Sequence, residues 1–238
     1  MERNFFLRAL AWLGRHELAT LLAIGGLAAG VWLFAALADE VMEGGTRKLD
    51  TALLLAMRRP GDLQPLGPPP LLNAARDITA LGGPSVLTLL TVATCLFLAL
   101  DGKMHMALFV GGSIGSGVLV SYLLKDSFDR PRPDIVPHEV YAASYSFPSG
   151  HSMLAALTYL TLGAILARAH ERKLLKAYFL LTALFLSVLI GVTRVYLGVH
   201  WPTDELAGWT AGAVWALLCW LLARWLQNRR TLEPEAQH

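Results

Sequence analysis

The sequence predicts an all-α integral membrane protein: a bundle of six transmembrane helices, with short interfacial helices in the first outer loop. Two observations predict this class. Of the 238 residues, 55% are hydrophobic and only 16% are charged, whereas a soluble domain typically carries about 25% charged residues. The apolar residues also form long continuous blocks. Backbone groups inside a bilayer must be hydrogen-bonded within the chain, so we expect these blocks to be helices rather than strands.

Composition also excludes several other classes. The net charge of +2 is too small to suggest a nucleic-acid partner. The cysteines Cys95 and Cys219 both lie inside apolar blocks, so we interpret them as buried small hydrophobic residues and expect no disulfide framework. The first apolar block is too long for a cleavable signal peptide and lacks a clear small-residue cleavage site.

The six expected spans are apolar runs separated by polar or Pro-rich segments. A helix needs about 20 residues to cross the hydrocarbon core, so the second and fourth runs must extend into flanking uncharged residues. A glycine-rich stretch at 111–117 fits close helix packing in the third run. The runs are Leu18–Leu37, Val86–Leu100, Met104–Leu124, Met153–Ala167, Ala177–Val195 and Leu206–Leu226.

These runs divide the chain into four regions. Residues 1–17 mix Arg with Phe, Trp and Leu, which predicts an amphipathic segment at the membrane interface. Residues 18–83 comprise the first transmembrane helix and a long outer loop, and residues 84–227 form a core of five further transmembrane helices. Residues 228–238 are a polar tail, which we expect on the cytoplasmic side.

The long outer loop contains two stretches with helical apolar spacing, 49–59 and 71–81. Pro60-Gly61 and the run from Gly67 to Pro70 break the chain between them. We therefore expect two short interfacial helices joined by a Pro-rich turn. Two roles remain open for them: they shape an entrance for lipid, or they are a packing cap over the bundle.

An even number of spans places both termini on one side of the membrane and three polar clusters on the other. Lys and Arg are slightly more numerous in the loops on the terminus side. Those on the opposite side fall in the long loop, where the positive-inside rule is weaker, or in the clusters themselves. We therefore expect a multi-pass inner (plasma) membrane protein with cytoplasmic termini and with the clusters facing the periplasm or exterior.

The first cluster runs from Lys125 to Pro133, directly after the third span. Arg130 and Arg132 offer planar forks that bind phosphate through two nitrogens, and Lys125 adds a point charge. Pro131 and Pro133 restrict the backbone and so fix where the arginines point. The alternative interpretation is an ordinary basic flank of a helix.

The second cluster, Ser146 to His151, opens the fourth span. Free backbone N–H groups at a helix start bind anions, and Gly150 lets an anion approach the backbone closely. Ser149 suits a helix cap, and His151 in the first turn is placed to transfer a proton near neutral pH. The alternative is a simple helix cap with an incidental histidine.

The third cluster, Thr193 to Asp204, lies between the fifth and sixth spans. His200 and Asp204 are four residues apart, so the carboxylate can reach one ring nitrogen and leave the other free as a nucleophile. Arg194 can hold a phosphate oxygen. The alternative has Asp204 complementing the helix dipole and His200 as a polar interface residue. Ionisable groups beside membrane spans are functional candidates by default, and together the three clusters predict phosphate chemistry.

The three clusters resemble the three-part signature of the type-2 phosphatidic acid phosphatase family, which shares its site with vanadium-dependent haloperoxidases. The resemblance covers roughly residues 86–226. Thr193 stands where the family often has Ser, and the family spacing leaves Arg130 as a support residue. The matching positions are Lys125-x6-Arg132-Pro133, Pro148-Ser149-Gly150-His151 and Arg194-x5-His200-x3-Asp204.

The resemblance implies a role for each matched residue. His200 would attack phosphorus and form a phosphohistidine, oriented by Asp204. His151 would protonate the leaving oxygen and then activate water. The phosphoryl oxygens would be held by Lys125, Arg132, Ser149, Gly150 and Arg194. No metal or other cofactor is expected, and the remaining histidines are expected to be bystanders: His16, His105, His138, His170 and His238.

The resulting hypothesis is a membrane lipid phosphatase. Its candidate substrates are undecaprenyl diphosphate, which we favour, phosphatidylglycerol phosphate and phosphatidic acid. The expected partners are the lipid phosphate and membrane lipid, with no nucleic acid, and the oligomeric state stays open. Two alternatives remain at this point: vanadate-dependent halide oxidation on the same scaffold, and a non-catalytic lipid-binding or transport protein with a relic site.

Overall fold

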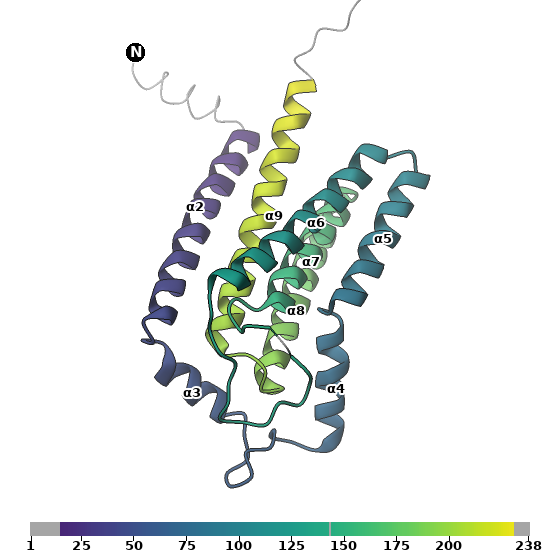
Figure 1. The fold of residues 1–238 in the computed structure, drawn as a ribbon. Helices are drawn as coiled ribbons and strands as arrows, with labels where there is room; N and C mark the ends of the chain where they lie inside the picture. Colours follow the sequence, from purple (N-terminus) through teal and green to yellow (C-terminus); the bar gives the residue numbers. More distant parts are fainter. Residues whose placement is uncertain (1–14, 143, 231–238) are drawn as a thin grey trace, which may run out of the picture.

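A computed structural model describes residues 15–142 and 144–230, and within these ranges the chain is helical (Figure 1). The backbone pairing outside helices is limited there to one isolated bridge between Arg58 and Pro65. The helices are α2 (Arg15–Met42), α3 (Arg47–Leu55), α4 (Pro69–Ala80), α5 (Pro84–Leu100), α6 (Met104–Ser127), α7 (Gly150–Arg168), α8 (Lys173–Tyr196) and α9 (Pro202–Arg230).

Five of these helices, α2, α6, α7, α8 and α9, are each long and apolar enough to cross a membrane. The expected second span is different, because α5 has only 17 residues. Helix α5 is long and apolar enough to cross a membrane only together with α4, from which it is bent by 45°. The described part of the chain therefore holds five spans, or six if the bent pair is one span.

Every expected span is longer in the structure than its apolar run, because polar and charged residues at the ends of the runs also adopt helical structure. The first helix continues to Met42, and the fourth begins at Gly150 with Ser149 as its cap. The last begins at Pro202, a residue favoured in the first helical turn. The two helices expected in the outer loop are present as α3 and α4. The N-terminal segment expected at residues 1–17 and the tail expected at residues 228–238 fall mostly outside the described residues.

Helix α7 is the centre of the bundle and packs along both α8 and α9, while α2 packs along α9 and α5 along α6 (Figure 1). Small residues allow this close approach. A Cβ added at Gly163 would meet the α8 backbone at 3.1 Å, and one at Gly208 would meet the carbonyl oxygen of Ser149 at 2.6 Å. Close α7–α8 and α7–α9 packing brings the second and third polar clusters together.

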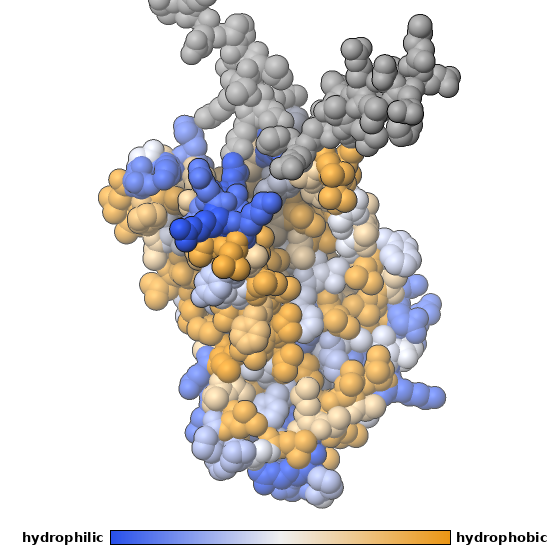
Figure 2. Space-filling view, turned by 180° about the vertical axis from the view of Figure 1, so that it is seen from behind, coloured by the Kyte–Doolittle hydropathy of each residue, from blue (hydrophilic) through white to orange (hydrophobic). Residues whose placement is uncertain are grey.

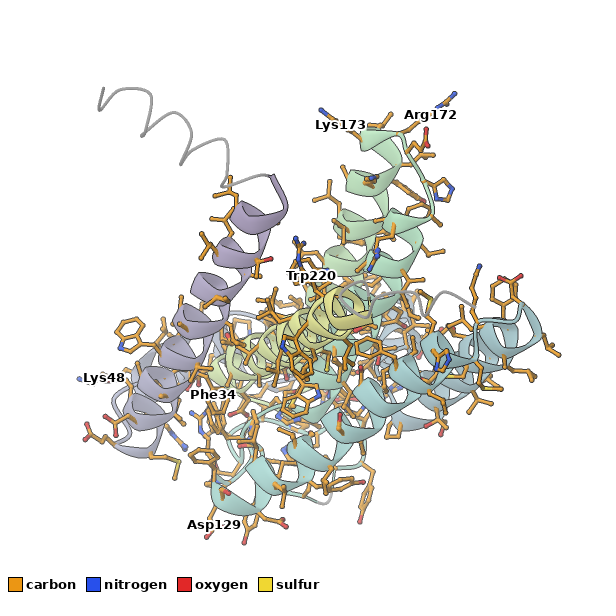
Figure 3. The ribbon with its side chains drawn as sticks, turned by 90° about the horizontal axis from the view of Figure 1, so that it is seen from above. Phe34, Lys48, Asp129, Arg172, Lys173 and Trp220 are labelled. Atoms are coloured by element: carbon orange, nitrogen blue, oxygen red, sulfur yellow. The ribbon has the colours of Figure 1, made fainter. Side chains whose placement is uncertain are left out.

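Both ends of the bundle can be followed in Figure 1: the start of α2 and the end of α9 lie at one end, and α3 and the turn between α8 and α9 lie at the other. The first and last described helices therefore begin and end at the same end of the bundle. Apolar residues cover most of the middle of the face seen in Figure 2, and hydrophilic residues gather toward its two ends. Arg172 and Lys173, at the start of α8, project outward from the bundle (Figure 3).

An aromatic cluster packs α2 against the segment between α6 and α7. Phe34 on α2 points toward the loop that carries Asp129 (Figure 3). Its ring centroid lies 6.3 Å from that of Phe128 and 5.9 Å from that of Phe147. Phe128 follows the first polar cluster's lysine and Phe147 precedes the second cluster's serine cap. The contact therefore holds the first two polar clusters against α2.

Candidate active site

The three polar clusters surround one cavity of about 440 Å³. Its polar wall includes most of the candidates that the sequence singled out, while Ser149 and Asp204 are fully buried behind that wall. The candidates that line it are Lys125, Arg132, Gly150, His151, Arg194 and His200. Residues far apart in the sequence thus meet at a single site, as the cluster argument predicts.

His200 lies in the turn between α8 and α9 and is 1% exposed. Its Nδ1 is 3.2 Å from Oδ2 of Asp204, and its Nε2 is 3.1 Å from Nη1 of Arg132. A carboxylate only accepts hydrogen bonds and a guanidinium only donates them, so Nδ1 carries the proton and Nε2 presents its lone pair. Nε2 also faces the cavity side of the ring, where Arg132 lies.

The electrostatic surroundings of His200 favour the neutral ring. Burial is the largest cause, and the positive charges of Arg132, Arg194 and Lys125 add to it, so the pKa of His200 lies well below its usual value of 6.5. His151 contributes in the same direction. A neutral imidazole with one oriented proton is the form that can act as a nucleophile.

Asp204 is positioned by more than its histidine. Its Oδ2 also accepts the backbone N–H of Trp201 at 2.9 Å, and its Oδ1 accepts from Nη1 of Arg130 at 2.5 Å. Its backbone carbonyl accepts the N–H of Ser149 at 3.0 Å, which joins the start of α7 to the start of α9. The carboxylate can therefore rotate little, and this fixes the plane of the His200 ring.

Lys125 and Arg132 are held over the cavity by backbone carbonyls of the segment before α7. Nζ of Lys125 donates to the carbonyl of Tyr145 at 2.9 Å, and Nε of Arg132 donates to that of Ser144 at 2.7 Å. Arg132 also donates to the carbonyl of Val199 at 2.6 Å. Both cations therefore point inward, although Lys125 comes from α6 and Arg132 from the loop.

The start of α7 forms the part of the cavity wall beside Lys125. Ser149 caps the helix, with its Oγ accepting the N–H of Ser152 at 3.4 Å. A Cβ added at Gly150 would meet Cε of Lys125 at 3.2 Å, so the glycine lets the lysine approach the helix N-terminus. His151 follows within the first turn and lines the cavity.

Arg194, from the last turn of α8, completes the polar wall. Its Nη1 lies 3.4 Å from Oγ1 of Thr79 on α4, and its buried Nε has no hydrogen-bond partner. An unpaired buried guanidinium nitrogen is costly and marks a place for an oxyanion. The contact with Thr79 also gives α4 a direct part in shaping the site.

Sequence reasoning missed four buried polar residues that support this site: Asp50 on α3, Thr79 on α4, and Thr203 and Glu205 on α9. Asp50 bonds Arg130 and Thr203 rather than any cavity residue. Glu205 bonds the hydroxyl of Ser152, and its Oε1 is unpartnered. One signal was available for each carboxylate: an acidic residue on the apolar face of a helix.

The inner part of the cavity is apolar. It continues between α5 and α6, which pack together at the terminus end through Leu98, Ala107 and Val110. Toward the site the two helices leave room. The apolar or small residues lining this part include Leu87, Val92, Gly111, Ile114, Gly115 and Val118. The residues on α6 extend from Lys125 back to Gly111, about 21 Å at 1.5 Å per residue.

The other described histidines lie away from the cavity lining. His138 Nε2 lies 2.6 Å from the carbonyl of Pro133, and His170 Nδ1 lies 3.0 Å from that of Leu166. Neither of them nor His105 lines the cavity. His16 and His238 lie outside the residues whose side chains are described. Within residues 15–142 and 144–230, no three His, Cys, Asp or Glu side chains are grouped as metal ligands.

The chain is similar in sequence to known proteins. The family model of the PAP2 superfamily matches residues 106–228, more than half of the chain. Phosphatidylglycerophosphatase B of Bacillus subtilis is 38% identical over 114 residues, 47% of this chain and 53% of the relative. Lipid A 1-phosphatase of Rhizobium johnstonii is 35% identical over 112 residues, 43% of this chain and 41% of the relative. The chain thus spans about half the length of these curated relatives.

Solved structures show the same fold. The crystal structure of a transmembrane PAP2-type phosphatidylglycerolphosphate phosphatase from Bacillus subtilis matches with a TM-score of 0.72 and 27% identity. That match covers 88% of this chain and 98% of the other. Aquifex aeolicus LpxE matches with a TM-score of 0.51 and 25% identity, over 73% of this chain and 93% of the other.

Proposed function

This chain belongs to the PAP2 superfamily, and from that premise we propose that it is a membrane lipid phosphatase that works through a phosphohistidine on His200. The observation that carries the proposal is the state of the His200 ring. Its Nδ1 proton is directed at Asp204, 3.2 Å away, and its Nε2 lone pair faces the cavity. The expected role of a nucleophile requires this tautomer.

In the first step, Nε2 of His200 attacks phosphorus as the bond from phosphorus to the lipid oxygen breaks. His151, which also lines the cavity, donates a proton to the departing oxygen, so the lipid leaves as an alcohol or as a lipid monophosphate. Arg132 must release Nε2 as the substrate enters, and a phosphoryl oxygen takes over its N–H. The charge that forms on the imidazole ring is balanced by Asp204.

In the second step, water attacks the phosphorus of the phosphohistidine and the P–N bond breaks. His151, having lost its proton in the first step, takes one from the water. Inorganic phosphate leaves, and His200 returns to its starting tautomer. The same histidine serves as acid and then as base, so each turnover begins and ends with the same protonation states.

The positive charge that stabilises the transferred phosphoryl group comes from side chains. We assign Lys125, Arg132 and Arg194 to its oxygens, together with the backbone N–H groups at the start of α7, where Ser149 and Gly150 lie. The unpartnered Nε of Arg194 supports this assignment, because an entering phosphate oxygen would satisfy it. On this scheme the reaction needs no metal ion.

We propose a lipid substrate because of the cavity's apolar continuation between α5 and α6. A headgroup held by the cations leaves its hydrocarbon in that space, at the depth of the membrane. The names of similar proteins give three substrate classes for a test: phosphatidylglycerol phosphate, undecaprenyl diphosphate and lipid A phosphate. Phosphatidic acid is a fourth candidate from the family resemblance.

We propose that the site faces the periplasm or exterior, with both chain ends cytoplasmic. The bias of Lys and Arg toward the terminus-side loops supports this orientation. A membrane-impermeant maleimide should label Asp129→Cys in intact cells, and label Lys173→Cys only after lysis. Asp129 lies in the loop after α6 and Lys173 at the start of α8, so the single span α7 separates the two loops. The reverse labelling pattern would overturn the proposed membrane orientation and would leave the proposed reaction mechanism unaffected.

The deciding experiment is phosphate release by purified protein in detergent with EDTA. The panel holds the four lipids and one soluble phosphomonoester, with His200→Ala as the inactive control. Release from a lipid that His200→Ala abolishes supports the proposal. Full release by His200→Ala contradicts the phosphohistidine mechanism, and saturable lipid binding without turnover supports a relic site. Halide oxidation with added vanadate would support the oxidase alternative.

A further inference from the structure

Helix α3 presents one face to the segment that carries the nucleophile. Arg47, Asp50 and Leu54 lie three and four residues apart, so they share that face. The guanidinium of Arg47 lies 4.3 Å from the ring centroid of Trp201, and Leu54 packs in the same buried cluster as Trp201. Trp201 directly follows His200, so α3 packs beside the nucleophile without lining the cavity.

Asp50 is the most constrained residue of this face. It is fully buried and accepts hydrogen bonds from three residues. Oδ1 accepts the backbone N–H of Thr203 at 3.0 Å, and Oδ2 accepts the hydroxyls of Thr203 at 2.7 Å and Thr46 at 3.0 Å. Nη2 of Arg130 donates to the same Oδ2 at 2.6 Å.

Arg130 uses its two terminal nitrogens to bridge two buried carboxylates. Nη2 binds Asp50, while Nη1 binds Asp204 at 2.5 Å and the hydroxyl of Thr203 at 2.8 Å. Neither Asp50 nor Arg130 lines the cavity, so neither touches a substrate there. The bridge therefore ends at the carboxylate that orients His200, and it begins on a helix outside the bundle core.

We propose that Asp50 is a positioning residue for phosphoryl transfer: through Arg130 it holds Asp204, and hence His200, in the attacking orientation. This inference rests on the function proposed above. Anchoring the second terminal nitrogen of Arg130 restricts rotation of the guanidinium, and Asp50 supplies that anchor. With Oδ1 of Asp204 restrained, Oδ2 keeps its place on Nδ1 of the His200 ring.

Asp50 also sets the charge seen by the nucleophile. The bridge holds two carboxylates and one guanidinium, so it contributes one net negative charge beside His200. That charge opposes the cations on the other side of the ring. The charged and titratable groups that face His200 are Lys125, Arg132, His151, Arg194 and Asp204. Neutralising Asp50 makes this environment more positive, and neutralising Arg130 makes it more negative.

Two variants test the inference in purified protein, with phosphatidic acid or whichever panel lipid the wild type hydrolyses. Asp50→Asn should lower kcat about ten- to hundredfold, the effect of a buried charged hydrogen bond. KM should change less than about threefold, because Asp50 touches no substrate. The double variant Asp50→Asn/Arg130→Gln should be no slower than Arg130→Gln alone, since Asp50 acts through Arg130.

The pH profile separates positioning from a purely structural role. The acidic limb of kcat/KM should move to lower pH in Asp50→Asn and to higher pH in Arg130→Gln. A merely structural carboxylate would lower both rates without moving the limbs in opposite directions. Arg76→Gln is the matched control: Arg76 pairs with Glu139 at 2.8 Å and also fastens an outer helix, α4, but the pair is away from Asp204. It should keep kcat within about twofold.

The outcomes distinguish this inference from the function on which it rests. If the wild type releases no phosphate from any lipid, the proposed function fails. If the wild type is active and Asp50→Asn matches it in kcat and pH profile, only the role of Asp50 is overturned. Should Asp50→Asn not fold, Thr203→Val removes the shared hydroxyl and keeps both charges. A kcat lowered about three- to tenfold would then support the bridge, and an unchanged kcat would overturn it.

Discussion

Asp204→Asn removes one negative charge from beside the proposed nucleophile and changes little else in size. Three donors converge on the carboxylate: Nδ1 of His200 at 3.2 Å, the backbone N–H of Trp201 at 2.9 Å and Nη1 of Arg130 at 2.5 Å. An asparagine has one acceptor oxygen, and its NH₂ group must face one of these donors. The variant therefore loses both the charge and the fixed tautomer of His200.

The size of the effect follows from the distance. Two unit charges about 4 Å apart attract by about 4 kcal/mol at an effective dielectric constant near 20. That attraction is available only once the His200 ring becomes positively charged during phosphoryl transfer, so its loss raises the barrier. At about 1.4 kcal/mol for each factor of ten, kcat should fall about 1,000-fold.

The assay is steady-state phosphate release by detergent-purified Asp204→Asn on the best panel lipid, at a temperature where gel filtration and circular dichroism show folded protein. Removing one partner of a buried ion pair destabilises a protein by roughly 3–5 kcal/mol, so the comparison must be made well below the unfolding transition. A folded variant that keeps kcat within tenfold of wild type would refute the assignment of Asp204 as the residue that orients His200.

Three further predictions concern other residues. His151→Gln should form the phosphoenzyme from an aryl phosphate, because that leaving group needs no proton. Hydrolysis of the phosphoenzyme should then stall, which would give a burst of the aryl alcohol without turnover. Steady phosphate release at the wild-type rate would count against the role of His151 as the base. The lowered pKa of His200 means that its neutral form is lost only well below pH 6.5, so kcat/KM should hold as the pH falls through 6.5, and a limb centred at 6.5 would contradict this. Thr158→Val removes a fully buried hydroxyl that has no hydrogen-bond partner. This variant should raise the free energy of unfolding by about 1 kcal/mol. A lower melting temperature than wild type would show that the hydroxyl is hydrogen-bonded.

Much of the fold could be predicted because apolar block length reports directly on membrane-spanning helices. The bend between α4 and α5 was not predictable in this way. The break at Leu81–Gly83 interrupts a helical pair whose apolar patterns differ, so the second span and an outer-loop helix were assigned separately. The bend between α4 and α5 depends on packing against α8, because a Cβ added at Gly82 would meet Ile190 on α8 at 2.5 Å.

The site divides in a similar way. His200 and Asp204 are close in sequence, and their spacing of four residues predicted the contact between them. The residues that the sequence missed act across long separations: Asp50 contacts Thr203 from 153 positions away, and Thr79 contacts Arg194 from 115. A single sequence carries no signal of such pairing beyond a polar residue on an apolar helix face, which is also what an ordinary interface helix shows.

The distance between Asp50 and its partners along the chain has a consequence for biogenesis. Ribosomes add roughly 5–20 residues per second, so the 153 positions between Asp50 and Thr203 take about 8–30 s to synthesise. During that interval Asp50 on α3 lacks its hydrogen-bond partner on α9, Thr203. A nascent chain thus has the proposed phosphate-binding cations before the proposed nucleophile, and the candidate site is complete only with insertion of the last helix.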